Sequence, residues 1–361
     1  MKVVIMHQTV TNHDAIGNDI EEMCSILSGI CDCFVFAENR LNDTVAYVDE
    51  RTFESIILQP ENLLIYHHSV YWEKGESLLA RAKARIVIRY HNITPPEFFS
   101  PYNNFHEVQC RRGREQTERL VKKCSQAYWL CDSVFNQLDI PMVPKEKTAV
   151  CAPFHKIETW SAEIPDEKVM KQLLYTPAIN LLSVGRIAPN KGHLFLLDVL
   201  QTFRLNYKQD IHLWIIGKFD SGLQGYNDEI RRRIKRYGQE SHVHLVGEIS
   251  DSIISAYYLG CDFFMCTSEH EGFCVPLEEA QYFKLPVIAR RSSAVPETLG
   301  QEQLILEENL LEYAAAIQVL YQNAQYRQWL RQQGRENYNC RFTYENIEKT
   351  FLETLTAWNA L

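Results

Sequence analysis

The stretch TSEHEGFCVPLEEA, residues 267–280, is the most informative part of the sequence. It follows a short apolar run, passes through a glycine loop at Gly272 and continues into a pattern typical of a helix. Pro276 can open that helix, because proline is favoured at the first helical position. The backbone N–H groups that begin the helix are then available to an anion, and the helix dipole favours negative charge there. We therefore expect a strand, a diphosphate-binding turn and a helix.

Two carboxylates bracket this turn. Glu271 lies before the expected helix start and Glu279 lies on its first turns, so they can meet different parts of one elongated ligand. A sugar nucleotide offers hydroxyl groups at its ribose and at its sugar. The alternative is that both glutamates are surface acids near a helix N-terminus.

A second stretch, LLSVGRIAPNKGH at residues 181–193, also takes a strand through a loop into a helix. Its loop carries Arg186 and Lys191. When a sugar leaves a nucleoside diphosphate, negative charge builds on the departing phosphate, and fixed cations can stabilise it. The sequence contains no Asp-x-Asp triplet that would hold a metal for this purpose, so we expect no metal and no cofactor. The alternative is a solvent-exposed Gly-Arg loop.

Around these stretches, short apolar runs alternate with amphipathic ones, which is the pattern of parallel sheets with crossover helices. The polar, proline-punctuated stretch 160–177 divides the runs into two groups, and the amphipathic stretch 344–361 follows the second group. We therefore predict an α/β protein with two Rossmann-like, doubly wound parallel-sheet domains. The expected strands are 3–7, 33–37, 63–67, 86–91, 127–131 and 148–151, and then 180–184, 211–216, 243–246, 263–266 and 285–289.

Ligands of such sheets bind beyond the carboxyl ends of the strands. In the first half this rule selects His91, in RYHNITPPE at residues 89–97, with the pair His67 and His68 and the residues Asp132-Ser133. A single histidine at such a position has either a functional role or a hydrogen-bonded structural one. For the histidine pair we prefer the structural role.

Composition excludes several classes of protein. With 361 residues, 46% hydrophobic content and a net charge of −9, the chain is globular and too acidic for a nucleic-acid binder. The eleven cysteines show no zinc or redox spacing and fit a reduced, cytoplasmic protein. No apolar segment approaches the roughly twenty residues of a membrane span. Basic stretches such as 111–123 and 231–236 are either solvated helix faces or sites of peripheral membrane association.

Common phosphate and hydrolase motifs are absent. No Gly-x-Gly-x-x-Gly turn follows the first strand, which disfavours a dinucleotide oxidoreductase. The sequence also lacks a Walker loop, a zinc-protease helix and a Gly-x-Ser-x-Gly elbow.

With these residues in hand, the chain resembles the retaining glycosyltransferases with the GT-B fold, glycosyltransferase family four. The resemblance is carried by Glu271 and Glu279, with seven residues between them, and by Gly185-Arg186 followed by Lys191-Gly192. It extends through most of the second half and is looser in the first, where a glycine pair common in relatives is reduced to Gly17.

The resemblance implies a division of the chain and a role for each residue. The domains would be 1–170 together with 344–361, on the acceptor side of a cleft, and 171–343, on the donor side. Glu279 would bind the ribose, Arg186 and Lys191 the diphosphate, Glu271 the sugar, and His91 the sugar from the other domain. The catalytic set is Glu271, His91, Lys191 and Arg186. The implied donor-binding set is Arg186, Lys191, Glu271, Gly272, Phe273, Cys274, Val275, Pro276, Leu277, Glu279, Gly17, Val246 and Gly247.

The function expected from all of this is a retaining, metal-independent glycosyltransferase. It would move a sugar from a nucleotide-sugar donor to a glycan or a lipid-linked acceptor in the synthesis of a surface polysaccharide or glycoconjugate, in the cytoplasm or at the inner face of the membrane. Two alternatives remain: a sugar-nucleotide hydrolase or epimerase of the same fold, and a catalytically silent binding scaffold. Turnover of the donor distinguishes the three.

Overall fold

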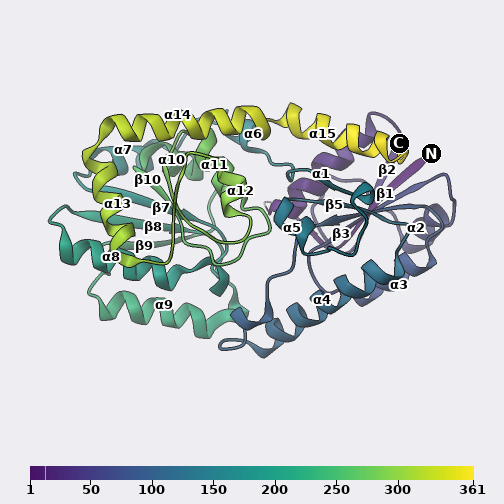
Figure 1. The fold of residues 1–361 in the computed structure, drawn as a ribbon, viewed down its shortest axis with the longest axis horizontal. Coiled ribbons are helices and arrows are strands. Elements are labelled where there is room, and N and C mark those ends of the chain that lie inside the picture. The colour runs from purple at the N-terminus through teal and green to yellow at the C-terminus, as the bar shows by residue number, and fades with distance from the viewer. Residues whose placement is uncertain (13) are drawn as a thin grey trace. The chain divides into compact units, whose positions relative to one another are not determined.

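The computed structural model describes residues 1–12 and 14–361, which form two compact units. The first unit consists of residues 1–96, 108–156 and 342–361, and the second consists of residues 97–107 and 157–341. Each unit is built on its own six-stranded parallel sheet (Figure 1).

The first sheet has the strand order β2-β1-β3-β4-β5-β6, and every neighbouring pair is parallel. Its strands are apolar on both faces, because helices cover the sheet from both sides. All six residues of β3, for example, are buried. The strand bounds are β1 (Lys2–Thr11), β2 (Asp32–Leu41), β3 (Leu63–His68), β4 (Arg85–Tyr90), β5 (Tyr128–Cys131) and β6 (Thr148–Val150).

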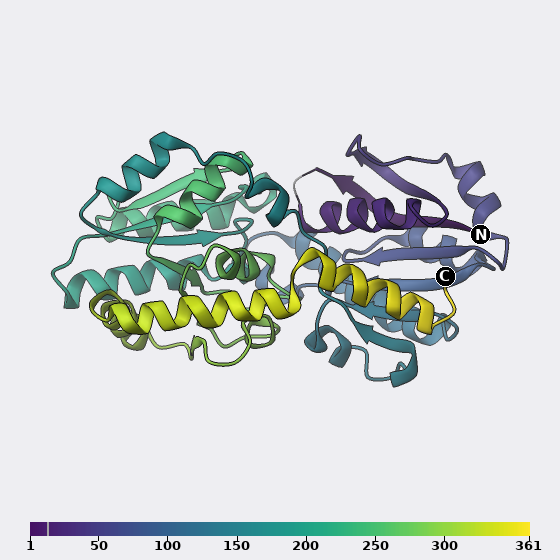
Figure 2. The same cartoon turned by 90° about the horizontal axis from the view of Figure 1, so that it is seen from above.

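Alternate residues of β1 enter two separate cores. Val3 and Ile5 pack with α1 (Ala15–Ser28) and α15 (Tyr344–Ala357). Val4 and Met6 face the opposite core, which contains side chains from α2 (Glu50–Ile57), α3 (Glu73–Arg81) and α4 (Asn104–Lys123). Both views show α15, in yellow, along the same face as α1 (Figures 1 and 2). The short helix α5 (Val134–Leu138) follows β5.

The second sheet has the order β12-β11-β10-β7-β8-β9 and is also parallel throughout. Helices again cover both faces, with α8, α9 and α13 on one and α7, α10, α11 and α14 on the other (Figure 1). The strands are β7 (Ile179–Val184), β8 (Ile211–Ile216), β9 (Val243–Gly247), β10 (Phe263–Cys266), β11 (Val287–Arg290) and β12 (Leu304–Leu306). The helices are α6 (Ile157–Trp160), α7 (Glu167–Tyr175), α8 (His193–Asn206), α9 (Gln224–Arg236), α10 (Asp251–Gly260), α11 (Val275–Tyr282), α12 (Val295–Leu299), α13 (Leu310–Gln322) and α14 (Ala324–Arg341).

The predicted fold class of two doubly wound parallel sheets is confirmed. Each of the eleven expected strands corresponds to an observed one, and β12 is the strand that the sequence did not predict. The division of the chain differs from the expected boundary after residue 170. Residues from Ile157 onward belong to the second unit, because Trp160 stacks on Phe283 at 5.3 Å and the Asp166 N–H donates to the Ser252 carbonyl at 3.0 Å.

Residues 97–107 also belong to the second unit, although the sequence assigned them to the first domain. The Tyr102 hydroxyl donates to Glu229 at 2.9 Å, and His106 lies 3.1 Å from the Asp220 carboxylate. None of the helices in the described chain is long and apolar enough to cross a lipid bilayer.

Candidate functional site

The loops that follow β7 and β10 are held together by hydrogen bonds from backbone and side chain. The Glu269 N–H donates to the Asn190 carbonyl at 2.8 Å, and the Asn190 amide donates to the His270 carbonyl at 3.1 Å. Gly192 has φ +68°, and a Cβ at this position would lie 2.1 Å from the Thr267 carbonyl oxygen. Only glycine fits this close approach without strain. The two stretches that the sequence singled out separately therefore form one site at the carboxyl edge of the second sheet.

Lys191 and Glu271 meet in this site. The Lys191 Nζ lies 2.7 Å from Oε1 and 2.8 Å from Oε2 of Glu271, and their side chains are 21% and 8% exposed. Burial works to lower the pKa of Lys191, but the charge and hydrogen bond of Glu271, together with the neighbouring Cys274 and Cys266, outweigh burial, so the pKa is raised. The Glu271 N–H donates to the Ser293 Oγ at 2.7 Å, and this bond holds the backbone that carries the carboxylate. The site therefore holds a charged pair with solvent at one side.

Arg186 lies one residue beyond the glycine that follows β7, and its side chain is exposed. The loops after β7 and β8 touch here, since a Cβ at Gly217 would lie 1.9 Å from the Gly185 carbonyl oxygen. Within the described residues, no hydrogen bond or ion pair engages the Arg186 guanidinium. Arg186 is therefore available to an anion from solvent.

Glu279 lies on α11, and its Oε2 accepts a hydrogen bond from the Tyr258 hydroxyl at 2.5 Å. Burial raises the pKa of Glu279 to about 7, against the lowering effect of this hydrogen bond. Burial, together with the Glu279 charge, holds the pKa of Tyr258 well above its ordinary value. The structure thus gives Glu271 and Glu279 different partners, Lys191 and Tyr258. Tyr258 was not identified from the sequence, because an aromatic residue in an amphipathic helix is usually a core residue.

The start of α11 differs from the expectation in detail. The helix begins at Val275, so Pro276 occupies its second position, and Cys274 before it has φ +84°. The Leu277 N–H donates to the Cys274 carbonyl at 3.0 Å, and Pro276 has no N–H. Neither of these two residues therefore offers a backbone donor to a ligand. In this turn, the residues that can still offer a backbone N–H group to a ligand as expected are those before Pro276.

Gly17 has a structural reason to be glycine. It lies in the first turn of α1, its N–H donates to Asp14 at 2.6 Å, and a Cβ would lie 2.0 Å from the Thr11 carbonyl oxygen. In the second unit Val246 and Gly247 end β9, and the Gly247 carbonyl accepts the Gly217 N–H at 2.9 Å. This contact brings the end of β9 beside the loop after β8.

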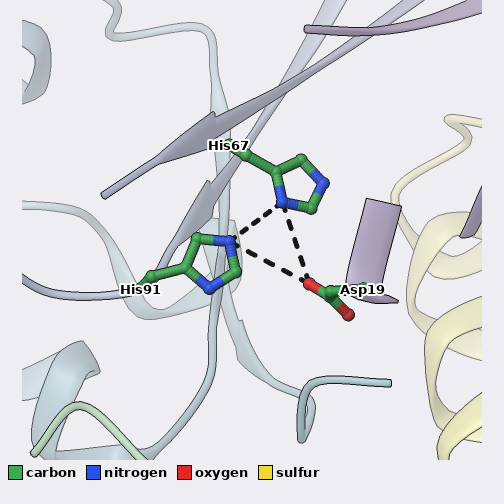
Figure 3. A group of neighbouring side chains, drawn as sticks. All are labelled: Asp19, His67 and His91. Atoms are coloured by element: carbon green, nitrogen blue, oxygen red, sulfur yellow. Dashed lines mark hydrogen bonds and ion pairs between the residues drawn. The ribbon is translucent and has the colours of Figure 1, made fainter. Parts of the chain in front are cut away.

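His91 belongs to a closed network in the first unit (Figure 3). Its Nε2 lies 2.9 Å from the His67 Nδ1, and its Nδ1 lies 2.8 Å from the Asp132 carboxylate. Both ring nitrogens are thus engaged within the unit, so the geometry does not favour the expected hydrogen bond from this ring to a donor sugar. The buried Arg89 pairs with Asp132 at 3.1 Å and with Asp19 at 2.9 Å.

Asp19 and Arg89 were not identified as site residues from the sequence. Asp19 lies on α1 among apolar residues, and Arg89 lies inside a strand that otherwise reads as core. Two ionisable residues at core positions are the signal that could have found them, since charges are seldom buried without a partner.

Comparison with known proteins gives a family match over part of the chain and a fold for the whole of it. Residues 166–337 match the family model described as Glycosyl transferases group 1. The O-antigen chain mannosyltransferase B of Escherichia coli is 24% identical over 136 residues, which are 37% of this chain and 34% of that protein. The serotype-specific mannosyltransferase WbdA of Escherichia coli is 30% identical over 132 residues, 36% of this chain and 16% of that protein. The matches thus span about a third or less of these relatives.

Solved structures resemble the whole chain. HepE of Anabaena in complex with UDP-glucose superimposes with a TM-score of 0.78 at 18% identity, over 99% of this chain and 100% of that one. WaaG, a glycosyltransferase involved in lipopolysaccharide biosynthesis, gives a TM-score of 0.69 at 13% identity, over 98% and 99%. At these identities the likeness shows the fold, which is the GT-B fold of two Rossmann-like domains.

Proposed function

We propose that this chain, whose residues 166–337 match the glycosyl transferases group 1 family, transfers a sugar from a nucleoside-diphosphate sugar to a glycan or lipid-linked acceptor. The observation that carries the proposal is the Lys191–Glu271 pair beside the start of α11. In one partly exposed site, the cation can bind the diphosphate of a sugar nucleotide and the carboxylate can bind the hydroxyls of its sugar.

The donor would bind by exchanging partners with this pair. A phosphate oxygen replaces Glu271 at the Lys191 ammonium, and Arg186 approaches the diphosphate from solvent. Glu271, released from Lys191, accepts hydrogen bonds from the hydroxyls of the sugar.

The ribose would bind at Glu279. Its carboxylate accepts one hydrogen bond from Tyr258, which leaves lone pairs for the two ribose hydroxyls. The base would lie near the end of β9, at Val246 and Gly247. The turn formed by Gly272, Phe273, Cys274 and Val275 would approach the diphosphate at the amino end of α11, where the helix dipole favours an anion.

Chemistry at this site needs no metal in our proposal. Lys191 and Arg186 stabilise the charge that develops on the leaving diphosphate, which is the role a bound cation has in other transferases. We assign no side-chain nucleophile. We propose retention at the anomeric carbon, with the acceptor proton passing to a diphosphate oxygen on the same face of the sugar.

The identity of the sugar in the donor is a narrower proposal. Relatives named mannosyltransferases point to a hexose, and the fold neighbour in complex with UDP-glucose points to a nucleotide hexose. A relative named for the O-antigen chain supports a role in polysaccharide synthesis. We place this role at the cytoplasmic side of the membrane, where a lipid-linked acceptor is reachable.

Calorimetric titration with UDP-, GDP-, ADP- and TDP-hexoses, with and without EDTA, tests the proposal. We expect one nucleotide class to bind, EDTA to have no effect, and Glu279→Ala to abolish binding. Glu269→Ala is the matched control, because this carboxylate is exposed in the loop before α11 and has no assigned donor contact. Binding without subsequent turnover of the donor would favour a silent scaffold, and turnover without an acceptor would favour a hydrolase.

A further inference from the structure

Three potential metal ligands converge inside the first unit. His67 lies near the end of β3, His91 follows β4, and Asp19 comes from α1 (Figure 3). Asp19 and His67 have fully buried side chains, and that of His91 is 8% exposed. One ligand atom from each residue lies within 4.8 Å of the other two.

The spacing of these atoms suits a metal ion. His67 Nδ1 lies 2.9 Å from His91 Nε2 and 3.8 Å from Asp19 Oδ2, and His91 Nε2 lies 4.0 Å from the same oxygen. A point equidistant from the three atoms lies at about the 2.0–2.2 Å at which zinc binds imidazole nitrogen and carboxylate oxygen. At that distance the ion lies in the plane of the three atoms, so the positions on either side of this plane remain for water.

The outer contacts also match those of a metal site. His91 directs its other nitrogen, Nδ1, at the Asp132 carboxylate 2.8 Å away, which leaves the Nε2 lone pair facing the centre. Histidine ligands commonly have such a carboxylate partner. Asp19 is oriented by the Arg89 Nε at 2.9 Å and by the Phe154 N–H at 2.8 Å, so its position does not depend on a metal.

The charges of the network leave room for a cation. Two carboxylates, Asp19 and Asp132, face a single guanidinium, Arg89.

We propose that Asp19, His67 and His91 bind one divalent cation of the zinc class. Imidazole ligands favour zinc, cobalt or nickel over magnesium, which prefers an all-oxygen shell. This site is independent of the donor proposal, because its residues belong to the first unit and the donor residues to the second.

A second histidine pair provides the control. His212 Nδ1 and His244 Nε2 also lie 2.9 Å apart, on β8 and β9 of the second unit. Among the described residues, that pair has no third ligand placed as Asp19 is in the first group. Comparing metal binding at the two histidine pairs therefore distinguishes a three-ligand site from incidental binding to two adjacent imidazoles.

The test is titration of the full chain with Co²⁺, under a phosphine reductant, while the visible d–d absorption is recorded. We expect one Co²⁺ per chain with the d–d spectrum of nitrogen and oxygen ligands, displaced by Zn²⁺ and not by Mg²⁺. His67→Gln and His91→Gln should each weaken binding at least tenfold, whereas His212→Gln should leave it unchanged. Circular dichroism checks that each variant is folded. If His67→Gln does not fold, His91→Gln, at the edge of the network, still tests the site.

The opposite results overturn the proposal. Absence of Co²⁺ binding would mean that the His67–His91 contact is a simple hydrogen bond. Binding that is retained in His91→Gln and lost in His212→Gln would place the metal at the second pair. A sulfur charge-transfer band would assign it to cysteine.

Discussion

The two units use buried charge differently. In the first, Arg89, Asp19 and Asp132 form a network with side chains at most 5% exposed, and each group already has a partner. In the second, Lys191 and Glu271 pair at a surface-connected loop and Arg186 is exposed. A closed network contributes to structure or holds an ion, whereas an open pair can exchange one partner for a ligand. The position of charge relative to solvent thus separates two kinds of site that the same residue types can form.

The largest expected effect contrasts two arginines. Arg89→Met should lower the free energy of unfolding by about 3–5 kcal/mol, because it leaves two buried carboxylates without their cation. Arg186→Met should leave stability unchanged within about 0.5 kcal/mol, since its side chain is exposed. Urea unfolding of both variants measures the difference. Equal destabilisation would break the contrast between a closed and an open site.

Lys191→Ala should lower turnover of the donor by roughly 10²–10³-fold while the protein stays folded, because the leaving diphosphate loses a fixed positive charge. Lys171→Ala is the control, since Lys171 pairs with Glu167 on the surface of α7 and with no other side chain among the described residues. Steady-state kinetics of both variants is the measurement. Normal turnover in Lys191→Ala would remove this residue from the mechanism.

Donor affinity should depend on pH through Glu279. Because the pKa of this carboxyl is raised to about 7, it is protonated in more molecules below that pH and accepts ribose hydroxyls less well. Affinity should therefore rise between about pH 6 and about pH 8. Glu279→Gln should flatten the profile. A wild-type profile that is flat over this range would contradict the ribose assignment.

The same group makes a stability prediction of known sign. A carboxyl whose pKa is higher in the folded state than the ordinary 4.5 favours folding when protonated. Its contribution is present below about pH 4.5 and is lost as the pH rises through about 7. Glu279→Gln should therefore gain stability relative to wild type as the pH rises, as measured by urea unfolding. A constant difference would show that Glu279 is not desolvated.

The smallest effect concerns Tyr258, which orients Glu279. Tyr258→Phe removes one hydrogen bond and should weaken donor binding by roughly 1 kcal/mol, about fivefold, with little change in turnover at saturation. Tyr257→Phe, at the adjacent position of α10, is the control. A loss of turnover with unchanged affinity would assign Tyr258 a different role.

Local sequence pattern predicted the strands because each is a short apolar run between polar loops. β12 was missed because its three residues lie among polar ones, and their burial depends on pairing with β11. The contact-based division begins the second unit at Ile157 rather than after residue 170, because α6 and α7 pack on elements distant in sequence. The side-chain pairs of both sites could not be predicted from the sequence either. Lys191 and Glu271 are 80 residues apart, and Arg89 and Asp19 are 70 apart. Such pairs are set by topology.

The exchange of partners at Lys191 is the central claim, and Glu271→Gln tests it most directly. Calorimetry would compare the affinities of the nucleoside diphosphate and of the matching diphosphate sugar in both proteins. We predict that wild type prefers the diphosphate sugar, and that Glu271→Gln binds the bare diphosphate at least as tightly but loses this preference. A variant that keeps the preference, or a wild type that binds neither ligand, would contradict the account.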